Sequence, residues 1–116
     1  VPRRRVWVIG MLAGKDIAAI LEPLFGAGDG AGIDVGDVIV APPPTQRAAD
    51  VTDLLRVVRE TGATAQRSSS IDAAIDLASE QAGERGAVIV VGSLYTVAAA
   101  REHLLGLTGD RVLGLR

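Results

Sequence analysis

The residues best suited to chemistry lie in two short loops, residues 11–16 and 92–96. The first loop carries Lys15, and the second carries the hydroxyl groups of Ser93 and Thr96. An ammonium group, hydroxyl groups and the backbone N–H groups at a helix N-terminus are favourable partners for an anion. If the two loops face each other, they form a crevice suited to a carboxylate or a phosphate.

Each of these residues also has a simpler structural interpretation. A lysine in a loop is most often a solvated charge, and a serine or threonine before a helix is most often a cap that accepts from a backbone N–H group. Gly10 and Gly92 would then do no more than allow tight turns. For such residue types the structural interpretation is the more common one, and only the position of the two loops in the fold supports an anion site.

The composition excludes several other kinds of site. The chain has no cysteine and one histidine, which excludes a disulfide scaffold, a thiolate zinc site and any site with two imidazoles. The pattern GxxxxGK followed by Ser or Thr is absent, so the chain has no P-loop for a nucleoside triphosphate. Asp72 and Asp76 fit a solvated helix face, and His103 fits a surface position without a titratable partner. We therefore expect no metal site and no catalytic side chain.

The size and charge of the chain limit its class and its partners. The 116 residues suit one domain, residues 1–116, and the 48% hydrophobic and 3% aromatic content predicts an aliphatic core. A net charge of −2 argues against a nucleic-acid partner. No apolar run approaches the roughly 18–20 residues of a membrane span, and no signal-peptide pattern is present. We expect a cytoplasmic domain with no membrane partner.

The elements that must position the two loops alternate between strand and helix periods. Short apolar runs predict buried strands, and apolar residues at i, i+3, i+4 and i+7 predict amphipathic helices between them. The run Ser68-Ser69-Ser70 is expected to supply the cap of the third helix, and Gly62 to end the second. The strands are expected at residues 6–9, 37–41, 63–67 and 87–91, and the helices at residues 17–24, 51–58, 71–78 and from residue 96 onward.

This alternation predicts an α/β fold of the Rossmann-like, three-layer kind, with a mostly parallel sheet and helices on both faces. The fourth run is the most apolar, which favours a central position, and the third is the least apolar, which favours an edge. A strand order of 3-2-1-4 fits a Rossmann-like sheet and places the first and fourth strands side by side. Ligands of such sheets bind past the carboxyl ends of the strands, where the strand order reverses, so the two loops would meet there.

Three stretches of the sequence, residues 10–17, 41–48 and 91–97, are distinctive together. They read GMLAGKDI, APPPTQRA and VGSLYTV. The first resembles the GML-x-DKD segment of the folylpolyglutamate synthase/dihydrofolate synthase family, and the third resembles that family's GS-aromatic-x-V segment. The second is similar to the family's strand exit and the Arg-Ala pair that follows it. The three stretches occur in the family's order and span nearly the whole chain.

The resemblance implies the C-terminal domain of a Mur-ligase-type enzyme, a Rossmann-like domain that works with a larger N-terminal ATPase domain. Such an enzyme uses ATP and Mg²⁺ to convert a carboxylate of dihydropteroate or a folate to an acyl phosphate. The amine of L-glutamate then displaces phosphate and forms an amide. ATP, Mg²⁺ and most of the folate would be bound by the N-terminal domain, so residues 1–116 alone would be inactive.

The resemblance also implies roles for individual residues. Lys15 would pair with a carboxylate of glutamate, and Ser93 would hydrogen-bond the same amino acid. A charge-assisted contact of this kind contributes roughly 1.5–3 kcal/mol. Asp16 would cap its helix and fix the first loop. The remaining residues of the two motifs would support the loops: Gly10, Gly92, Tyr95 and Thr96.

The chain departs from the family's pattern in two respects. Gly14 stands where many relatives carry an aspartate or a similar polar residue, and the family's AHNP segment and the helix after it do not precede the first strand. Without that helix the first strand would lose cover on one face, so we expect self-association through exposed aliphatic surface. The alternative to the ligase domain is a stand-alone, non-enzymatic α/β module that binds a small anion.

Overall fold

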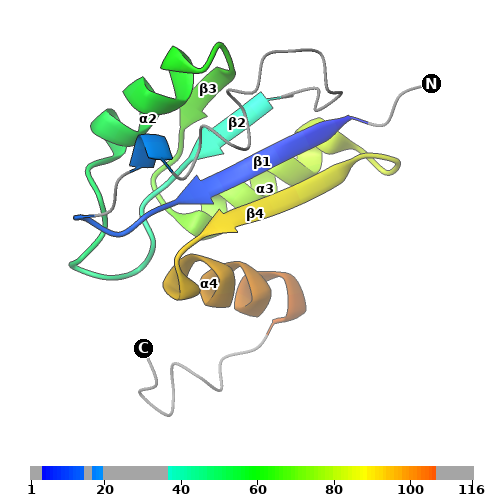
Figure 1. Cartoon of the computed structure of the whole chain (residues 1–116). Coiled ribbons are helices and arrows are strands. Elements are labelled where there is room, and N and C mark those ends of the chain that lie inside the picture. The colour runs from blue at the N-terminus through cyan, green and yellow to red at the C-terminus, as the bar shows by residue number, and fades with distance from the viewer. Residues whose placement is uncertain (1–3, 15–16, 20–36, 107–116) are drawn as a thin grey trace.

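The computed structural model of the chain describes residues 4–14, 17–19 and 37–106 (Figure 1). Of the helix expected over residues 17–24, residues 17–19 are helical and the rest lies outside the described residues. The elements follow in the order β1 (Arg5–Gly10), β2 (Asp37–Val40), α2 (Val51–Glu60), β3 (Thr64–Arg67), α3 (Ile71–Ala82), β4 (Ala87–Gly92) and α4 (Leu94–Leu105).

The four strands form one parallel sheet in the order β3-β2-β1-β4. This confirms the α/β fold, the predicted strand order and the edge position of β3. The expectation that the fourth run is central is wrong, because β4 pairs with β1 alone among the described strands and residues 88–91 are only half-buried. An apolar run indicates cover on both faces of a strand, whereas it does not indicate how many strands lie beside it.

Helices cover both faces of the sheet and give three layers (Figure 1). Side chains alternate along β1, so that Trp7 and Ile9 pack in the cluster that contains Leu54 and Val58 of α2. The intervening residues of β1 pack in a second cluster with α3 and α4. The core is aliphatic apart from Trp7, as the composition predicts.

β1 is buried on both faces. Val6, Val8 and Ile9 are fully buried, and Trp7 is 8% exposed. The expectation that the first strand loses cover on one face is therefore wrong, since a cluster of buried side chains packs against each of its faces. The large apolar side chains that are exposed among the described residues lie on α4 instead.

Polar side chains cap the N-termini of α2 and α3. The Asp50 carboxylate accepts from the backbone N–H of Thr52 at 2.7 Å, and Ser70 Oγ accepts from that of Ala73 at 3.1 Å, so the last serine of the predicted run is the cap. Gly62 follows the end of α2 with a φ of +92°, which confirms its predicted role in ending that helix.

None of the helices in the described ranges has the length and apolar content needed to span a bilayer.

Candidate functional site

β1 and β4 end side by side, because their parallel register pairs Gly10 with Gly92. The loops that follow the two strands therefore leave the same edge of the sheet, as the strand order predicts. The backbone N–H of Ser93 donates to the carbonyl of Gly10 at 3.3 Å, which joins the two loops directly. The described residues of the two motifs therefore meet at the carboxyl edge of the sheet.

The backbones of the two loops approach so closely that only glycine fits at positions 10 and 92. Gly92 has a φ of +145°, and a Cβ atom there would lie 1.8 Å from the carbonyl oxygen of Gly10. A Cβ atom on Gly10 would lie 2.7 Å from Thr96 Oγ1 and 2.9 Å from the carbonyl oxygen of Ala41. Both glycines therefore permit close approach of the two loops, beyond allowing a turn.

A hydrogen-bond network ties Ser93 and Thr96 to Gly10. The hydroxyl of Thr96, which is fully buried, donates to the carbonyl of Gly10 at 2.9 Å. Thr96 Oγ1 lies 3.2 Å from Ser93 Oγ, and the backbone N–H of Thr96 donates to Ser93 Oγ at 3.2 Å. Since the Thr96 proton goes to Gly10, the proton between the two hydroxyls comes from Ser93. Ser93 Oγ thus keeps one lone pair that can accept a further hydrogen bond.

The N-terminus of α4 adds a partial positive charge to this edge. Ser93 is the N-cap, and the first turn of the helix carries no acidic residue. Tyr95 lies in that turn and is half-buried, whereas Leu94 beside it is 82% exposed. The dipole of a 12-residue helix favours an anion at its N-terminal end.

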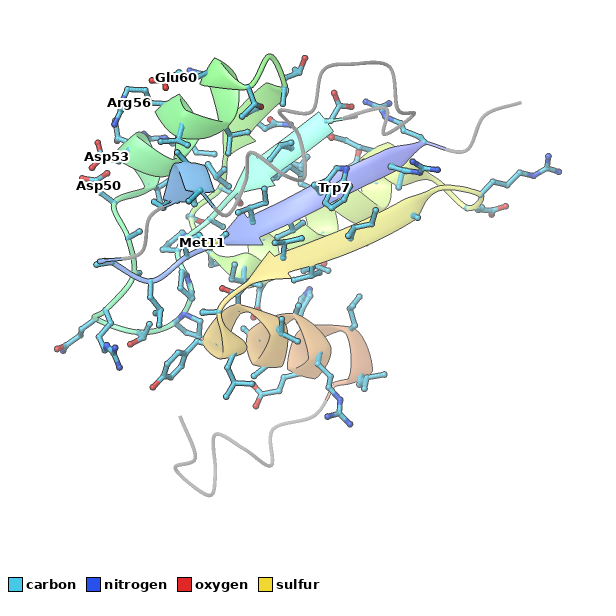
Figure 2. The ribbon with its side chains drawn as sticks, in the orientation of Figure 1. Trp7, Met11, Asp50, Asp53, Arg56 and Glu60 are labelled. Atoms are coloured by element: carbon cyan, nitrogen blue, oxygen red, sulfur yellow. The ribbon has the colours of Figure 1, made fainter. Side chains whose placement is uncertain are left out.

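The segment after β2 lies against the loop after β1 at the same edge. Leu12 and Ala48 form an antiparallel bridge, and the backbone N–H of Ala49 donates to the carbonyl of Met11 at 2.8 Å. The backbone N–H of Ala13 donates to the carbonyl of Arg47 at 2.6 Å. Figure 2 labels Met11, the residue that follows the end of β1. All three stretches that carry the family resemblance therefore meet at one edge.

Arg47 is a cation at this edge that the sequence interpretation did not place in the site. Its side chain is exposed, and among the described residues no carboxylate lies within ion-pair distance of it. The signal in the sequence was the Arg-Ala pair of the second stretch. That signal did not show that the chain returns antiparallel to the first loop, which is a tertiary contact.

Lys15 and Asp16 lie outside the described residues. Gly14, which directly precedes Lys15, has a φ of +83° and would meet no atom within 4 Å if it carried a Cβ. The left-handed backbone at this position favours glycine.

His103 belongs to the contact between α3 and α4, at the opposite end of α4 from Ser93. Its Nε2 lies 2.7 Å from Asp76 Oδ1, and its Nδ1 lies 3.7 Å from Asp72 Oδ2. The interpretation of His103 as a surface residue without a titratable partner is wrong, because α4 packs across α3 and the side chain is 28% exposed. No group of three His, Cys, Asp or Glu side chains within the described ranges is arranged to hold a metal ion.

Comparison with known proteins identifies one family. Residues 2–102 match the family model described as dihydrofolate synthetase, C-terminal domain. No curated protein matches the sequence significantly.

Solved structures of bacterial ligases share the fold and part of the sequence. FolC of Escherichia coli in complex with DHPP and ADP is 31% identical, with a TM-score of 0.74 over 91% of this chain and 23% of that chain. The bifunctional folylpolyglutamate synthase/dihydrofolate synthase of Yersinia pestis, complexed with AMPPNP and Mn ion, is 31% identical, with a TM-score of 0.68 over 90% of this chain and 22% of that chain. Folylpolyglutamate synthase of Mycobacterium tuberculosis, complexed with ADP and AMPPCP, is 25% identical, with a TM-score of 0.66 over 90% of this chain and 24% of that chain. The chain thus spans between 22% and 24% of the length of these proteins.

Proposed function

Because the chain belongs to the dihydrofolate synthetase C-terminal domain family, we propose that it holds the incoming L-glutamate in an ATP-dependent ligase acting on dihydropteroate or a folate. The proposal rests above all on the register that pairs Gly10 with Gly92. In that register both loop motifs start from one edge of the sheet, so a single small ligand can contact both.

The charges at this edge suit an amino acid with two carboxylates. We assign the carboxylates of glutamate to the cations Lys15 and Arg47, helped by the N-terminal end of α4. The free lone pair of Ser93 Oγ suits the amino group, which donates hydrogen bonds. Asp16 is the one acidic residue in the segments 10–16, 41–49 and 92–97. Apart from it, no carboxylate of these segments would repel the ligand.

The chemistry of ATP belongs, in this proposal, to an N-terminal ATPase domain outside residues 1–116. The described residues do not fit Mg²⁺, since they include no cluster of acidic side chains arranged for a metal ion, and the sequence has no P-loop. The nucleotides in the relatives' structures, with a Mn ion in one of them, support a nucleotide-dependent reaction. An enzyme that consumes ATP is expected in the cytoplasm, where ATP is supplied.

In the proposed reaction the role of this domain is to position the amine. The nitrogen of glutamate attacks the acyl carbon of the activated pteroate or folate, a C–N bond forms, and phosphate leaves with the electrons of the broken C–O bond. The amine loses a proton in the same step. The residues of this edge hold the nucleophile near the acyl carbon and touch neither phosphate nor nucleotide, so we expect them to affect the KM for glutamate first.

Substitution of the two cations in the full-length ligase tests the site. We expect Lys15→Ala and Arg47→Ala each to raise the KM for glutamate by about tenfold to a hundredfold, and to leave the KM for ATP unchanged. Arg101→Ala on α4 removes an exposed arginine elsewhere and is the matched control. An unchanged KM for glutamate in both variants would remove these residues from the site.

The hydroxyl of Ser93 needs a separate test, because it also caps α4. Ser93→Ala removes the cap, at a cost of about 1 kcal/mol in stability, as well as the proposed contact with glutamate. Ser93→Thr keeps a capping hydroxyl. We expect a raised KM for glutamate in Ser93→Ala and a nearly normal value in Ser93→Thr, with the melting temperature measured for both. Equal KM values in the two variants and the wild type would contradict a contact with glutamate.

Residues 1–116 on their own are expected neither to hydrolyse ATP nor to form an amide. The measurement is phosphate release and glutamate incorporation by the 116-residue chain, with the full-length ligase as the positive control. Turnover by the isolated chain would contradict the assignment of ATP to a separate domain. Binding of small anions without any activity in the full-length protein would favour the stand-alone module instead.

A further inference from the structure

A groove of about 500 Å³ lies between α2 and β3, and α2 covers the face of the sheet opposite to α4. Figure 2 shows Arg56 and Glu60, which line the groove, on the outward side of α2. Three of its lining residues are arginines, and one is acidic. The groove is lined by Thr52, Leu55, Arg56, Arg59, Glu60 and Arg67.

Two of these arginines are held in place by neutral acceptors. Arg59 donates from Nε and Nη2 to the carbonyl of Ala65, at 3.3 and 3.0 Å. Arg67 donates from Nη2 to Thr52 Oγ1 at 2.6 Å. In the part of the chain that the structure describes, no carboxylate lies within ion-pair distance of either guanidinium group. Their charges are therefore fixed in position but not compensated.

The third arginine differs, because it already has acidic partners. Arg56 Nη1 lies 2.9 Å from Glu60 Oε1, and Arg56 Nη2 lies 3.9 Å from Asp53 Oδ1. These two carboxylates of α2 already compensate part of its charge. We therefore expect Arg59 and Arg67 to contribute most of the attraction for an anion.

The spacing of the two uncompensated charges indicates the shape of the ligand. Arg59 and the Thr52 that holds Arg67 are two turns apart on α2, which corresponds to about 10 Å along the helix. Because the two guanidinium groups are anchored at separate places, we expect a chain that bears several acidic groups to suit both better than one phosphate or carboxylate does. The groove contains no aromatic side chain on which a nucleic-acid base could stack.

The groove begins at the edge of the sheet that carries the candidate glutamate site. Arg67 is the last residue of β3, and Thr52 is in the first turn of α2. The residue before the cap of α2 is Ala49, whose backbone N–H donates to the carbonyl of Met11 in the first loop. A chain that leaves the edge can therefore continue along α2.

We propose that this groove binds an extended oligocarboxylate of the kind that repeated glutamate addition builds. The identity of the ligand as an oligoglutamate rests on the proposed function, whereas the site itself rests on the groove and its two uncompensated arginines. The groove holds glutamates that have already been added, by ion pairs to Arg59 and Arg67, while Leu55 contacts the methylene groups between the carboxylates.

Direct binding to the 116-residue chain tests this proposal without any enzyme activity. The probe is a fluorescently labelled γ-linked pentaglutamate, followed by anisotropy at low salt. We expect the double variant Arg59→Gln/Arg67→Gln to bind the probe at least about tenfold more weakly than the wild type, and added salt to weaken binding by the wild type. Arg101→Gln removes an exposed arginine of α4, away from the groove, and this variant should bind the probe normally. Free glutamate and inorganic phosphate should compete poorly with the probe.

Arg59 also ties α2 to β3, so the double variant could lose binding through a folding defect. A second variant distinguishes this from loss of the anion site. Glu60→Gln removes the one carboxylate that lines the groove and should strengthen binding about threefold. Absence of pentaglutamate binding by the wild type, or equal binding by all variants, would overturn the proposal. Tighter binding of a single-stranded oligonucleotide than of the pentaglutamate would also overturn it. If the KM effects at Lys15 and Arg47 appear in the full-length ligase but no pentaglutamate binds, this proposal fails and the proposed function stands.

Discussion

Thr96 joins the two halves of the candidate site at the level of single side chains. Its hydroxyl donates to the carbonyl of Gly10, and its backbone N–H and hydroxyl oxygen both contact Ser93 Oγ. The side chain is fully buried, so no water replaces these hydrogen bonds if they are lost. Thr96 thus fixes the end of β1 relative to the start of α4, and it directs the proton of Ser93.

Replacing Thr96 by valine tests this link. Thr96→Val keeps the shape of the side chain but leaves the carbonyl of Gly10 with a single donor, the backbone N–H of Ser93 at 3.3 Å. We expect the free energy of unfolding, measured by urea denaturation of the 116-residue chain, to fall by about 1–3 kcal/mol. Thr96→Ser keeps the hydroxyl and is expected to lose about 1 kcal/mol, for the missing methyl group alone. Equal losses in the two variants would show that the hydroxyl does not stabilise the fold.

At this scale the sequence predicted the residue types of the site better than their partners. Ser93 and Thr96 stand in a recognisable motif, but the direction of their protons depends on Gly10, which is distant in sequence. Arg47 was missed for the same reason, since its place beside the first loop results from a bridge between Leu12 and Ala48. Such contacts between distant segments leave no periodic signal in the sequence.

Among the elements, α3 is a helix whose N-terminus is capped by one side chain. Ser70 Oγ accepts from the backbone N–H of Ala73, and the helix continues from Ile71 to Ala82. This helix contributes Ile71, Ala74, Ile75 and Ala78 to the core beneath β1. A weaker start of α3 therefore lowers the stability of the face that also packs against α4.

Loss of the Ser70 cap is expected to destabilise the domain measurably. Ser70→Ala leaves the N–H group of Ala73 without its side-chain acceptor, and we expect a loss of about 1 kcal/mol in the free energy of unfolding. Ser69→Ala is the matched control, because Ser69 is exposed and lies in the same run of serines. Thermal denaturation of the two variants beside the wild type provides the measurement. A loss in Ser69→Ala as large as that in Ser70→Ala would contradict the role of the cap.

The periodic signals in the sequence predicted the described elements and their order, and missed some of their limits. α3 extends to Ala82 rather than residue 78, because the spacing of apolar residues marks the buried face and not the last turn, which ends at Gly83 with a φ of +72°. The sequence also favoured a central β4, whereas β4 has a single neighbour in the part of the sheet that the structure describes. Strand neighbours depend on pairing between distant segments, so the apolar run alone could not decide this position.

For the molecule as a whole, α4 and β4 leave apolar surface exposed along one side. Residues 87–92 have a single neighbouring strand in the described structure and contain neither a charged residue nor a proline, the usual protections of an edge strand. One side of α4 packs on β4 and α3. Its other, outer side adds four large exposed apolar side chains. These are Leu94 at 82%, Val97 at 44%, Leu104 at 59% and Leu105 at 60% exposed.

This surface, rather than β1, is where we expect self-association of the 116-residue chain. Two copies can pair antiparallel through β4 and cover part of the outer side of α4, which satisfies backbone N–H and carbonyl groups and buries leucine side chains. Sedimentation velocity over increasing concentration is expected to show a dimer whose fraction rises with concentration. Leu104→Glu places a charge on the apolar surface and should shift the chain to a monomer, whereas Thr64→Glu on the opposite edge strand β3 should not. A wild type that stays monomeric at the highest concentration would contradict this prediction, and dissociation by Thr64→Glu would move the interface to β3.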